Sequence, residues 1–115
     1  MATKEEVERF LDKFKQKVKV FGLIFRDDRG KNQQTLLDLE INPKYRENIV
    51  TNLDAGDYVD GPIADTLNKT AEMWVFGKDV KGKDDYIKIT LGGENLSAVC
   101  ISFHIAEFRI KYLFK

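Results

Sequence analysis

Apolar residues near the start of the chain recur every three or four positions, with Glu and Lys between them, which is typical of a helix that buries one face. The segment before them, Thr3-Lys4-Glu5-Glu6, has the pattern of a capping box, in which the Thr and Glu side chains accept hydrogen bonds from each other's backbone N–H groups. We therefore expect a helix that begins after Thr3 and packs on a sheet. Its buried face would contain Val7, Phe10, Leu11, Phe14 and Val18.

After this helix, the spacing of apolar residues predicts a strand, two short helices and a loop in turn. Residues 18–25, VKVFGLIF, are rich in β-forming side chains and precede the turn residues RDDRGKN, so we expect a strand followed by a loop. The segment QQTLLDLEI predicts a short helix, and a second one should begin at Pro43 with Asn42 as its N-cap. The segment DAGDYVDGP, with two glycines and a proline, is predicted to be an ordered loop.

The C-terminal half contains three strand-like segments, residues 72–80, 85–91 and 97–104, joined by glycine-containing turns. We predict that they form a consecutive antiparallel meander. The fold class is therefore α+β, an antiparallel sheet with the N-terminal helices packed on one face. The last residues, FRIKYLFK, alternate between apolar and basic side chains and predict either an added edge strand, through which a homodimer could form, or a frayed terminus.

Side chains alternate between the two faces of a strand, so the last two segments each have an apolar and a polar face. The apolar set is Ile87, Ile89, Leu91, Val99, Ile101 and Phe103, and the polar set is Tyr86, Lys88, Thr90, Cys100, Ser102 and His104. A loop centred on Asn95 would place Tyr86 opposite His104 and Lys88 opposite Ser102.

A Tyr, a Lys and a His on one open face suit acid–base catalysis and phosphate binding, because His titrates near neutral pH and Lys can neutralise an oxyanion. The same residues also occur on sheet faces that simply contact water, so the pattern leaves both interpretations open. We expect Cys100 to be a buried or half-buried thiol rather than a nucleophile. Trp74 and Phe76 share a strand face and are predicted to lie in the core.

The composition narrows the class of protein. A length of 115 residues suffices for one domain, which we place at 1–115. Nineteen basic residues balance nineteen acidic ones, which argues against a general nucleic-acid binder but allows a local basic site. With a single His and a single Cys, neither a metal centre nor a cofactor is expected. The lone Cys and the absence of an apolar leader or spanning segment predict a cytoplasmic protein without a membrane partner.

Six segments together resemble the toxins of the motility quorum-sensing regulator (MqsR) family of bacterial type II toxin–antitoxin systems, which is similar to the wider RelE-like group of messenger-RNA interferases. The resemblance extends from about residue 18 to residue 107, and its most characteristic part is the W…G…Y-I-K-I…S-F-H arrangement of the sheet. The segments are IFRDDRGKN, TLLDLEI, DYVDGP, MWVFGKDVKG, DYIKITLG and VCISFHIAE.

This resemblance implies a RelE-like fold, metal-independent cleavage of messenger RNA and inhibition by a cognate antitoxin protein. Tyr86, Lys88 and His104 match the family's catalytic positions, the same three residues that the face argument selects. The chain departs from the family in having His104 where some members have Lys, and in lacking the Lys that some members carry in the DYVDGP segment. These departures leave the individual acid and base roles open.

A nuclease without a metal can use the ribose 2′-hydroxyl as its nucleophile, so RNA is the expected substrate. Such an enzyme needs a base for the 2′-hydroxyl, a cation for the phosphorane charge and an acid for the leaving 5′-oxygen, roles that the three residues can share. The alternative function is a non-catalytic protein-interaction module that uses the same sheet face. Further candidate substrate contacts are Lys78, Lys81, Ser102 and Arg26.

Overall fold

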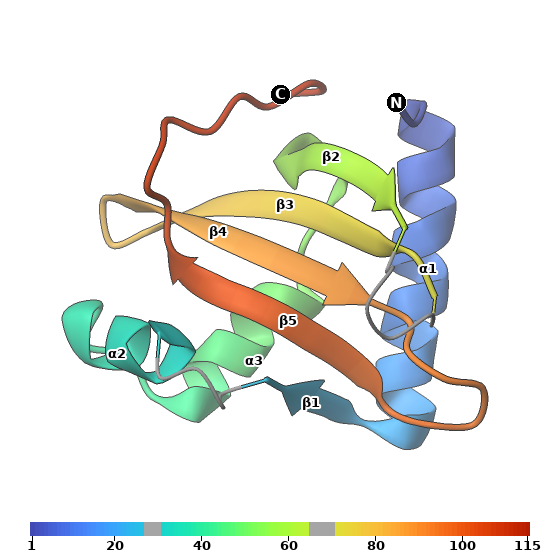
Figure 1. Cartoon of the computed structure of the whole chain (residues 1–115), viewed down its shortest axis with the longest axis horizontal. Helices are drawn as coiled ribbons and strands as arrows, with labels where there is room; N and C mark the ends of the chain where they lie inside the picture. Colours follow the sequence, from blue (N-terminus) through green and yellow to red (C-terminus); the bar gives the residue numbers. More distant parts are fainter. Residues whose placement is uncertain (27–30, 65–70) are drawn as a thin grey trace.

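The computed structural model describes residues 1–26, 31–64 and 71–115, except for the side chain of residue 31. Within these ranges, helices α1, α2 and α3 and a short 3₁₀ helix accompany a five-stranded sheet (Figure 1). The helices are α1 Lys4–Phe21, α2 Lys31–Asp38, α3 Pro43–Thr51 and the 3₁₀ helix η1 Ala55–Asp57. The strands are β1 Leu23–Phe25, β2 Tyr58–Ile63, β3 Met73–Val80, β4 Lys83–Thr90 and β5 Ala98–Ile105.

The sheet has the strand order β1-β5-β4-β3-β2. Strands β2 to β5 form an antiparallel meander, whereas β1 pairs with β5 in parallel. The predicted α+β class and the three-stranded meander are confirmed, although the sheet is mixed rather than wholly antiparallel. Among the helices described, none is both long and apolar enough to cross a lipid bilayer.

Helix α1 begins as predicted. The Thr3 N–H donates to the Glu6 carboxylate at 3.0 Å, and the Glu6 N–H donates to the Thr3 hydroxyl at 3.2 Å. The predicted strand over residues 18–25 is wrong in its first half, because the helix continues to Phe21 and only Leu23–Phe25 is extended. Gly22 ends the helix with φ of +86°, a conformation that residues with a Cβ adopt rarely.

The segment DAGDYVDGP is predicted to be an ordered loop, but in the structure it forms η1 and most of β2. Asp54 caps η1 by accepting a hydrogen bond from the Gly56 N–H at 2.9 Å, and β2 then pairs with β3. The glycine and proline of this segment are compatible with pairing because β2 is an edge strand whose register with β3 is irregular. The two short helices predicted before it are confirmed, and Asn42 caps α3 through a 2.7 Å hydrogen bond from the Tyr45 N–H.

The pairing of β4 with β5 confirms the predicted register near the candidate site, with Tyr86 opposite His104 and Lys88 opposite Ser102. Beyond Lys88 the register shifts by one residue, so that Cys100 faces Ile89. Because of this irregularity, Cys100 lies in the core and not on the polar face, so its predicted face is wrong. Its thiol is buried, which agrees with the predicted burial. Val99 correspondingly pairs with Thr90 rather than joining the apolar set.

The core lies between α1, α3 and one face of the sheet. The rings of Phe10 and Trp74 stack with centroids 4.5 Å apart. Phe10 also stacks with Phe14 at 6.1 Å and with Phe76 at 6.3 Å. Trp74 and Phe76 are therefore core residues, as predicted. The opposite sheet face, which carries Tyr86, Lys88, Ser102 and His104, is called the open face below.

The C-terminal segment, residues 106–115, is not a strand, so the edge strand on which the homodimer expectation rested is absent. Instead this segment, called the C-terminal strap below, folds back across the sheet (Figure 1). The Ala106 N–H donates to the Asp84 carbonyl at 2.8 Å, and the Phe114 ring stacks on Tyr58 with centroids 5.6 Å apart. A Cβ added to Gly77 would come within 2.8 Å of the Ile110 and Tyr112 side chains, so glycine is what allows the strap to lie this close to β3.

Candidate functional site

The open face and the C-terminal strap together border an open pocket of about 620 Å³. Strands β4 and β5 supply its floor, and the strap supplies a wall. The lining residues are Val59, Tyr86, Lys88, Ser102, His104, Ala106, Glu107, Phe108, Arg109, Ile110 and Lys111. The three residues predicted to be catalytic therefore line one pocket.

Tyr86 and His104 are cross-strand neighbours whose rings stack with centroids 5.1 Å apart and planes 17° apart. The Lys88 ammonium lies 6.0 Å from the centre of the Tyr86 ring. Ser102 is opposite Lys88 on β5. The pocket thus places a phenol, an imidazole and an ammonium within reach of one small ligand.

The His104 ring has a defined partner on one side. Its Nδ1 atom lies 3.1 Å from the backbone carbonyl oxygen of Ile105. Because a carbonyl oxygen can only accept, this hydrogen bond requires the proton on Nδ1. The neutral ring then has an unprotonated Nε2 atom, which is the form that a general base needs.

The Tyr86 hydroxyl is kept in its protonated form. Burial raises the pKa of this phenol, and the negative charge of Asp60 raises it further. At neutral pH the group is therefore a hydrogen-bond donor rather than a phenolate.

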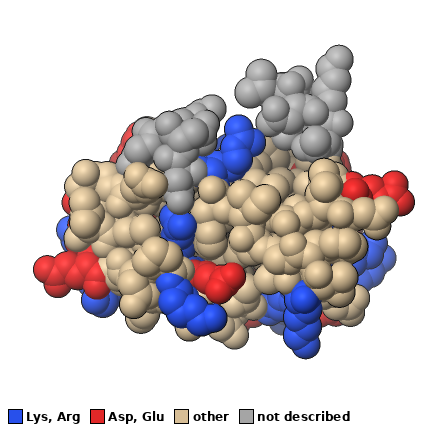
Figure 2. All heavy atoms as spheres, turned by 90° about the horizontal axis from the view of Figure 1, so that it is seen from below, with Lys and Arg blue, Asp and Glu red and all other residues tan. Residues whose placement is uncertain are grey.

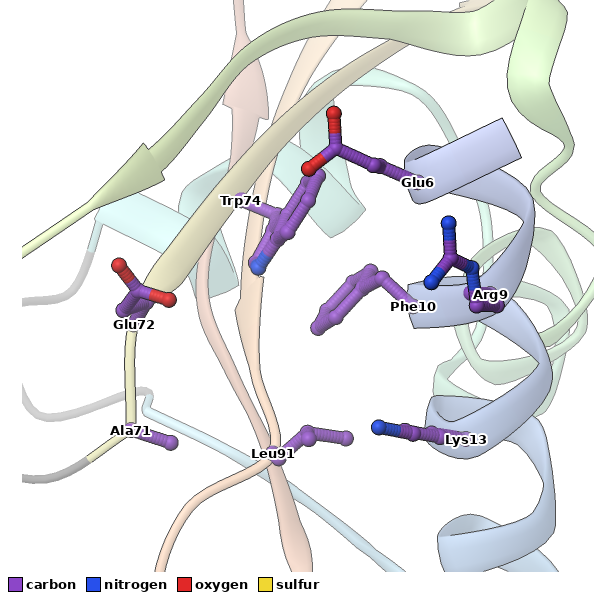
Figure 3. Close-up of a pocket in the computed structure, with 8 residues that line it drawn as sticks. All are labelled: Glu6, Arg9, Phe10, Lys13, Ala71, Glu72, Trp74 and Leu91. Atoms are coloured by element: carbon purple, nitrogen blue, oxygen red, sulfur yellow. The ribbon is translucent and has the colours of Figure 1, made fainter. Parts of the chain in front are cut away.

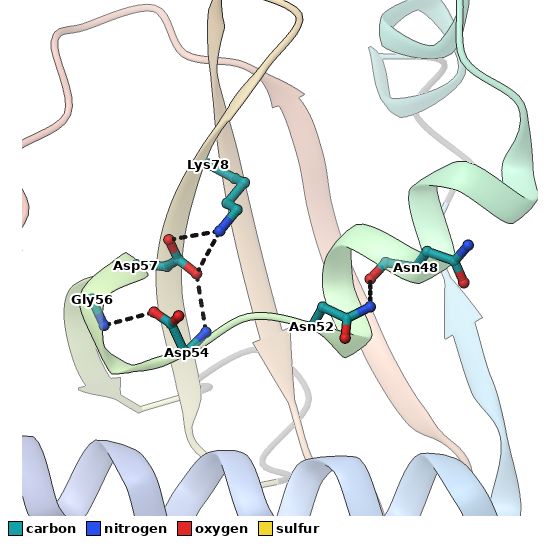
Figure 4. A network of polar contacts seen from close by, with 6 residues as sticks. All are labelled: Asn48, Asn52, Asp54, Gly56, Asp57 and Lys78. Carbon is teal, nitrogen blue, oxygen red and sulfur yellow. Dashed lines mark hydrogen bonds and ion pairs between the residues drawn. The ribbon is translucent and has the colours of Figure 1, made fainter.

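Two of the predicted phosphate contacts lie away from this pocket. The Lys78 ammonium forms an ion pair with Asp57, 3.3 Å from both carboxylate oxygens (Figure 4). Alternation along β3 places Lys78 on the face of Trp74 and Phe76, opposite the open face. Lys81 lies in the β3–β4 turn, where its ammonium donates to the Glu40 carbonyl at 3.0 Å. The structure therefore does not bring these two lysines together with Tyr86, Lys88 and His104.

Ser102 lies in the pocket, as expected for a substrate contact on this face. Arg26 follows β1, and its backbone N–H donates to the Cys100 carbonyl at 3.0 Å. Its side chain is exposed but does not line the pocket. The remainder of the predicted loop, residues 27–30, lies outside the described residues.

Sequence reasoning missed the contribution of Phe108, Arg109 and Lys111, which line the pocket from the strap. The alternating pattern of this segment predicts an edge strand or a frayed terminus, and neither places these side chains beside the open face. The signal that could have identified them is the pair of basic residues next to an aromatic one, close in sequence to the last strand. That pattern alone does not show on which face of the sheet the segment lies.

A second pocket, of about 450 Å³, lies between α1 and the start of β3 near the opposite face (Figure 3). Its charged residues are two cations from α1, Arg9 and Lys13, and two carboxylates, Glu6 and Glu72. It has no His or Tyr among its lining residues. The pocket on the open face is therefore the better candidate for acid–base chemistry.

The surface seen in Figure 2 has charges of both signs. On the side seen in Figure 2, basic and acidic side chains of the described residues are interspersed, without a large area of one sign. Among the described residues, no group of three or more His, Cys, Asp or Glu side chains is arranged to hold a metal ion.

Comparison of the chain with known protein families, with curated proteins and with solved structures found no match.

Proposed function

We propose that this protein is an endoribonuclease that cleaves RNA by attack of the ribose 2′-hydroxyl on the neighbouring phosphate. The observation that supports this function is the presence of Tyr86, Lys88 and His104 in one pocket, with the Nδ1 atom of His104 bound to a carbonyl and Nε2 left as a base. A base, a cation and a neutral hydroxyl donor are the groups that this reaction requires.

In the proposed reaction, His104 Nε2 removes the proton of the 2′-hydroxyl as its oxygen attacks phosphorus. Lys88 stabilises the negative charge on the phosphorane oxygens. The bond from phosphorus to the 5′-oxygen breaks, Tyr86 donates a proton to that oxygen, and solvent then reprotonates the phenolate. The products are a 2′,3′-cyclic phosphate and a 5′-hydroxyl end.

This mechanism predicts that cleavage of RNA persists in excess EDTA, because the nucleophile, base, cation and acid all come from the RNA and the protein. The measurement is the rate at which a labelled RNA is cleaved by the purified protein, with and without chelator. A matched DNA strand serves as the control and should stay intact, since it lacks the 2′-hydroxyl. Loss of cleavage in EDTA that an added divalent ion restores would contradict the proposed mechanism.

The resemblance to the MqsR family extends this proposal to a RelE-like toxin that acts on messenger RNA in the cytoplasm and is inhibited by a cognate antitoxin. Production of the chain alone in a bacterium is then expected to arrest growth and shorten cellular messenger RNA, and production of the neighbouring gene's protein should reverse both effects. His104→Ala, produced at the same level, is the control. Growth arrest by the parent and by this variant alike would contradict the proposal that RNA cleavage causes toxicity.

The alternative function is binding of a protein partner to the open face without catalysis. The formal net charge of zero favours it, because such a chain does not attract nucleic acid as a whole. The two functions differ in one readily measured property. A binding module leaves RNA intact at any protein concentration.

A further inference from the structure

We propose that the C-terminal strap is the part of the site that binds the substrate, with Phe108 stacking on an unpaired base and Arg109 and Lys111 contacting the phosphates beside the one that is cleaved. The substrate class is therefore single-stranded RNA. This inference rests on the proposed function, since it concerns the same pocket.

Phe108 is the most unusual side chain of the strap. It is 83% exposed at the margin of the pocket, whereas Ile110, Tyr112 and Phe114 in the same segment are partly buried. A Phe side chain stabilises a fold mainly when it is buried, so the fold gains little from Phe108 where it lies. An exposed ring beside a polar pocket suits stacking on a nucleobase, which is possible only when that base is unpaired.

The position of the strap is fixed on both sides of this residue. On one side, the Ala106 N–H donates to the Asp84 carbonyl at 2.8 Å. On the other, Ile110 and Tyr112 lie against Gly77, and the Leu113 N–H donates to the Tyr58 carbonyl at 3.5 Å. Residues held between such contacts are positioned before a ligand arrives, which lowers the entropy that binding must offset.

The charges of the pocket differ from those of the chain. Its lining contains three permanent cations, Lys88, Arg109 and Lys111, and a single carboxylate, that of Glu107. Even with the nearby Asp60 carboxylate, which acts on Tyr86, the pocket has more positive than negative charge, whereas the whole chain has a formal net charge of zero. Arg109 and Lys111 are exposed, so both can reach phosphates along a strand that passes through the pocket.

The test measures binding of a 2′-O-methyl single-stranded oligonucleotide, which lacks the attacking hydroxyl, by fluorescence anisotropy at several salt concentrations. Phe108→Ala should weaken binding by about 5- to 100-fold, the range for loss of one stacked base. Arg109→Ala should weaken binding and lower the slope of log affinity against log salt by about 0.7, the value for one phosphate contact on a single strand. A duplex of the same sequence should bind less tightly than the single strand.

The matched controls are Phe21→Ala and Arg9→Ala, which remove an exposed Phe and an exposed Arg from α1, outside this pocket. They should bind like the parent. If Phe108→Ala and Arg109→Ala also bind like the parent, the inference is wrong. That result differs from failure of the proposed function, in which the parent leaves unmodified RNA uncleaved whatever the strap variants do to binding.

Discussion

Replacing His104 by Ala is expected to slow RNA cleavage by about 10²- to 10⁴-fold, the usual contribution of one proton-transfer group. The reason is that the variant removes the Nε2 atom that would accept the proton of the 2′-hydroxyl. The side chain lies on the open face, outside the buried core, so the fold should be nearly unaffected. The measurement is the single-turnover rate on a labelled RNA, with thermal unfolding of the same samples.

Variants of the other two residues separate their roles. Tyr86→Phe retains the stacked ring and removes only the hydroxyl, so a large loss of rate would assign proton or hydrogen-bond donation to the phenol, and a small loss would assign stacking. Lys88→Ala should reduce both RNA binding and turnover, because the ammonium contacts phosphate before and during the reaction. If these variants and His104→Ala all remain folded and cleave at the parent rate, the pocket is not the active site.

Asp85→Asn is expected to change the pH dependence of stability more than any other single substitution considered. Asp85 lies on the core face of β4, opposite Lys78 on β3 and Ile105 on β5, and both of its carboxylate oxygens are buried without a hydrogen-bond partner among the described residues. The Lys78 ammonium is paired with Asp57 instead. Burial therefore raises the pKa of the Asp85 carboxyl to about 8.

The sign of the effect follows from proton binding. Between about pH 4 and pH 8 the unfolded chain releases this proton and the folded protein keeps it, so the stability that it contributes is full at low pH and is lost as pH rises. The free energy of unfolding of the parent, relative to that of Asp85→Asn, should fall by up to about 1.4 kcal/mol per pH unit in this window. Over the window the loss is on the order of a few kcal/mol.

Chemical denaturation of the two proteins at roughly pH 4.5, 6 and 7.5, three points within this window, gives the difference directly. Asp12→Asn, which changes an exposed carboxyl on α1, is the matched control and should follow the parent. An Asp85→Asn protein whose stability varies with pH in the same way as that of the parent would show that the carboxyl is ionised inside the fold.

The sequence sufficed to predict the floor of the pocket because local rules determine it. Strand alternation and a hairpin centred on Asn95 were enough to place Tyr86 opposite His104, and the structure has that pairing. The same rule failed for Cys100, since the irregularity after Lys88 inserts one residue into β5 and reverses the faces beyond it. Such an irregularity depends on packing between strands, which alternation in one strand does not reveal.

The wall of the pocket could not be predicted, because it depends on contacts between distant parts of the chain. The alternation of residues 108–114 fits an edge strand as well as it fits the strap. In the structure, Ile110 and Tyr112 of the strap lie against Gly77 of β3, far earlier in the chain, and alternation does not reveal such a contact. Lys78 is a different case, because alternation along β3 already places it on the face of Trp74 and Phe76, so its position could have been predicted from the sequence.

The most direct test of the central claim uses a DNA oligonucleotide with a single ribonucleotide at successive positions, incubated with the purified protein in EDTA. Attack by the 2′-hydroxyl predicts that each strand that is cut breaks only on the 3′ side of its ribose, leaving a 2′,3′-cyclic phosphate and a 5′-hydroxyl. Strands that stay intact at every position of the ribose while the all-RNA sequence is also uncut, or products that carry a 5′-phosphate, would contradict the account.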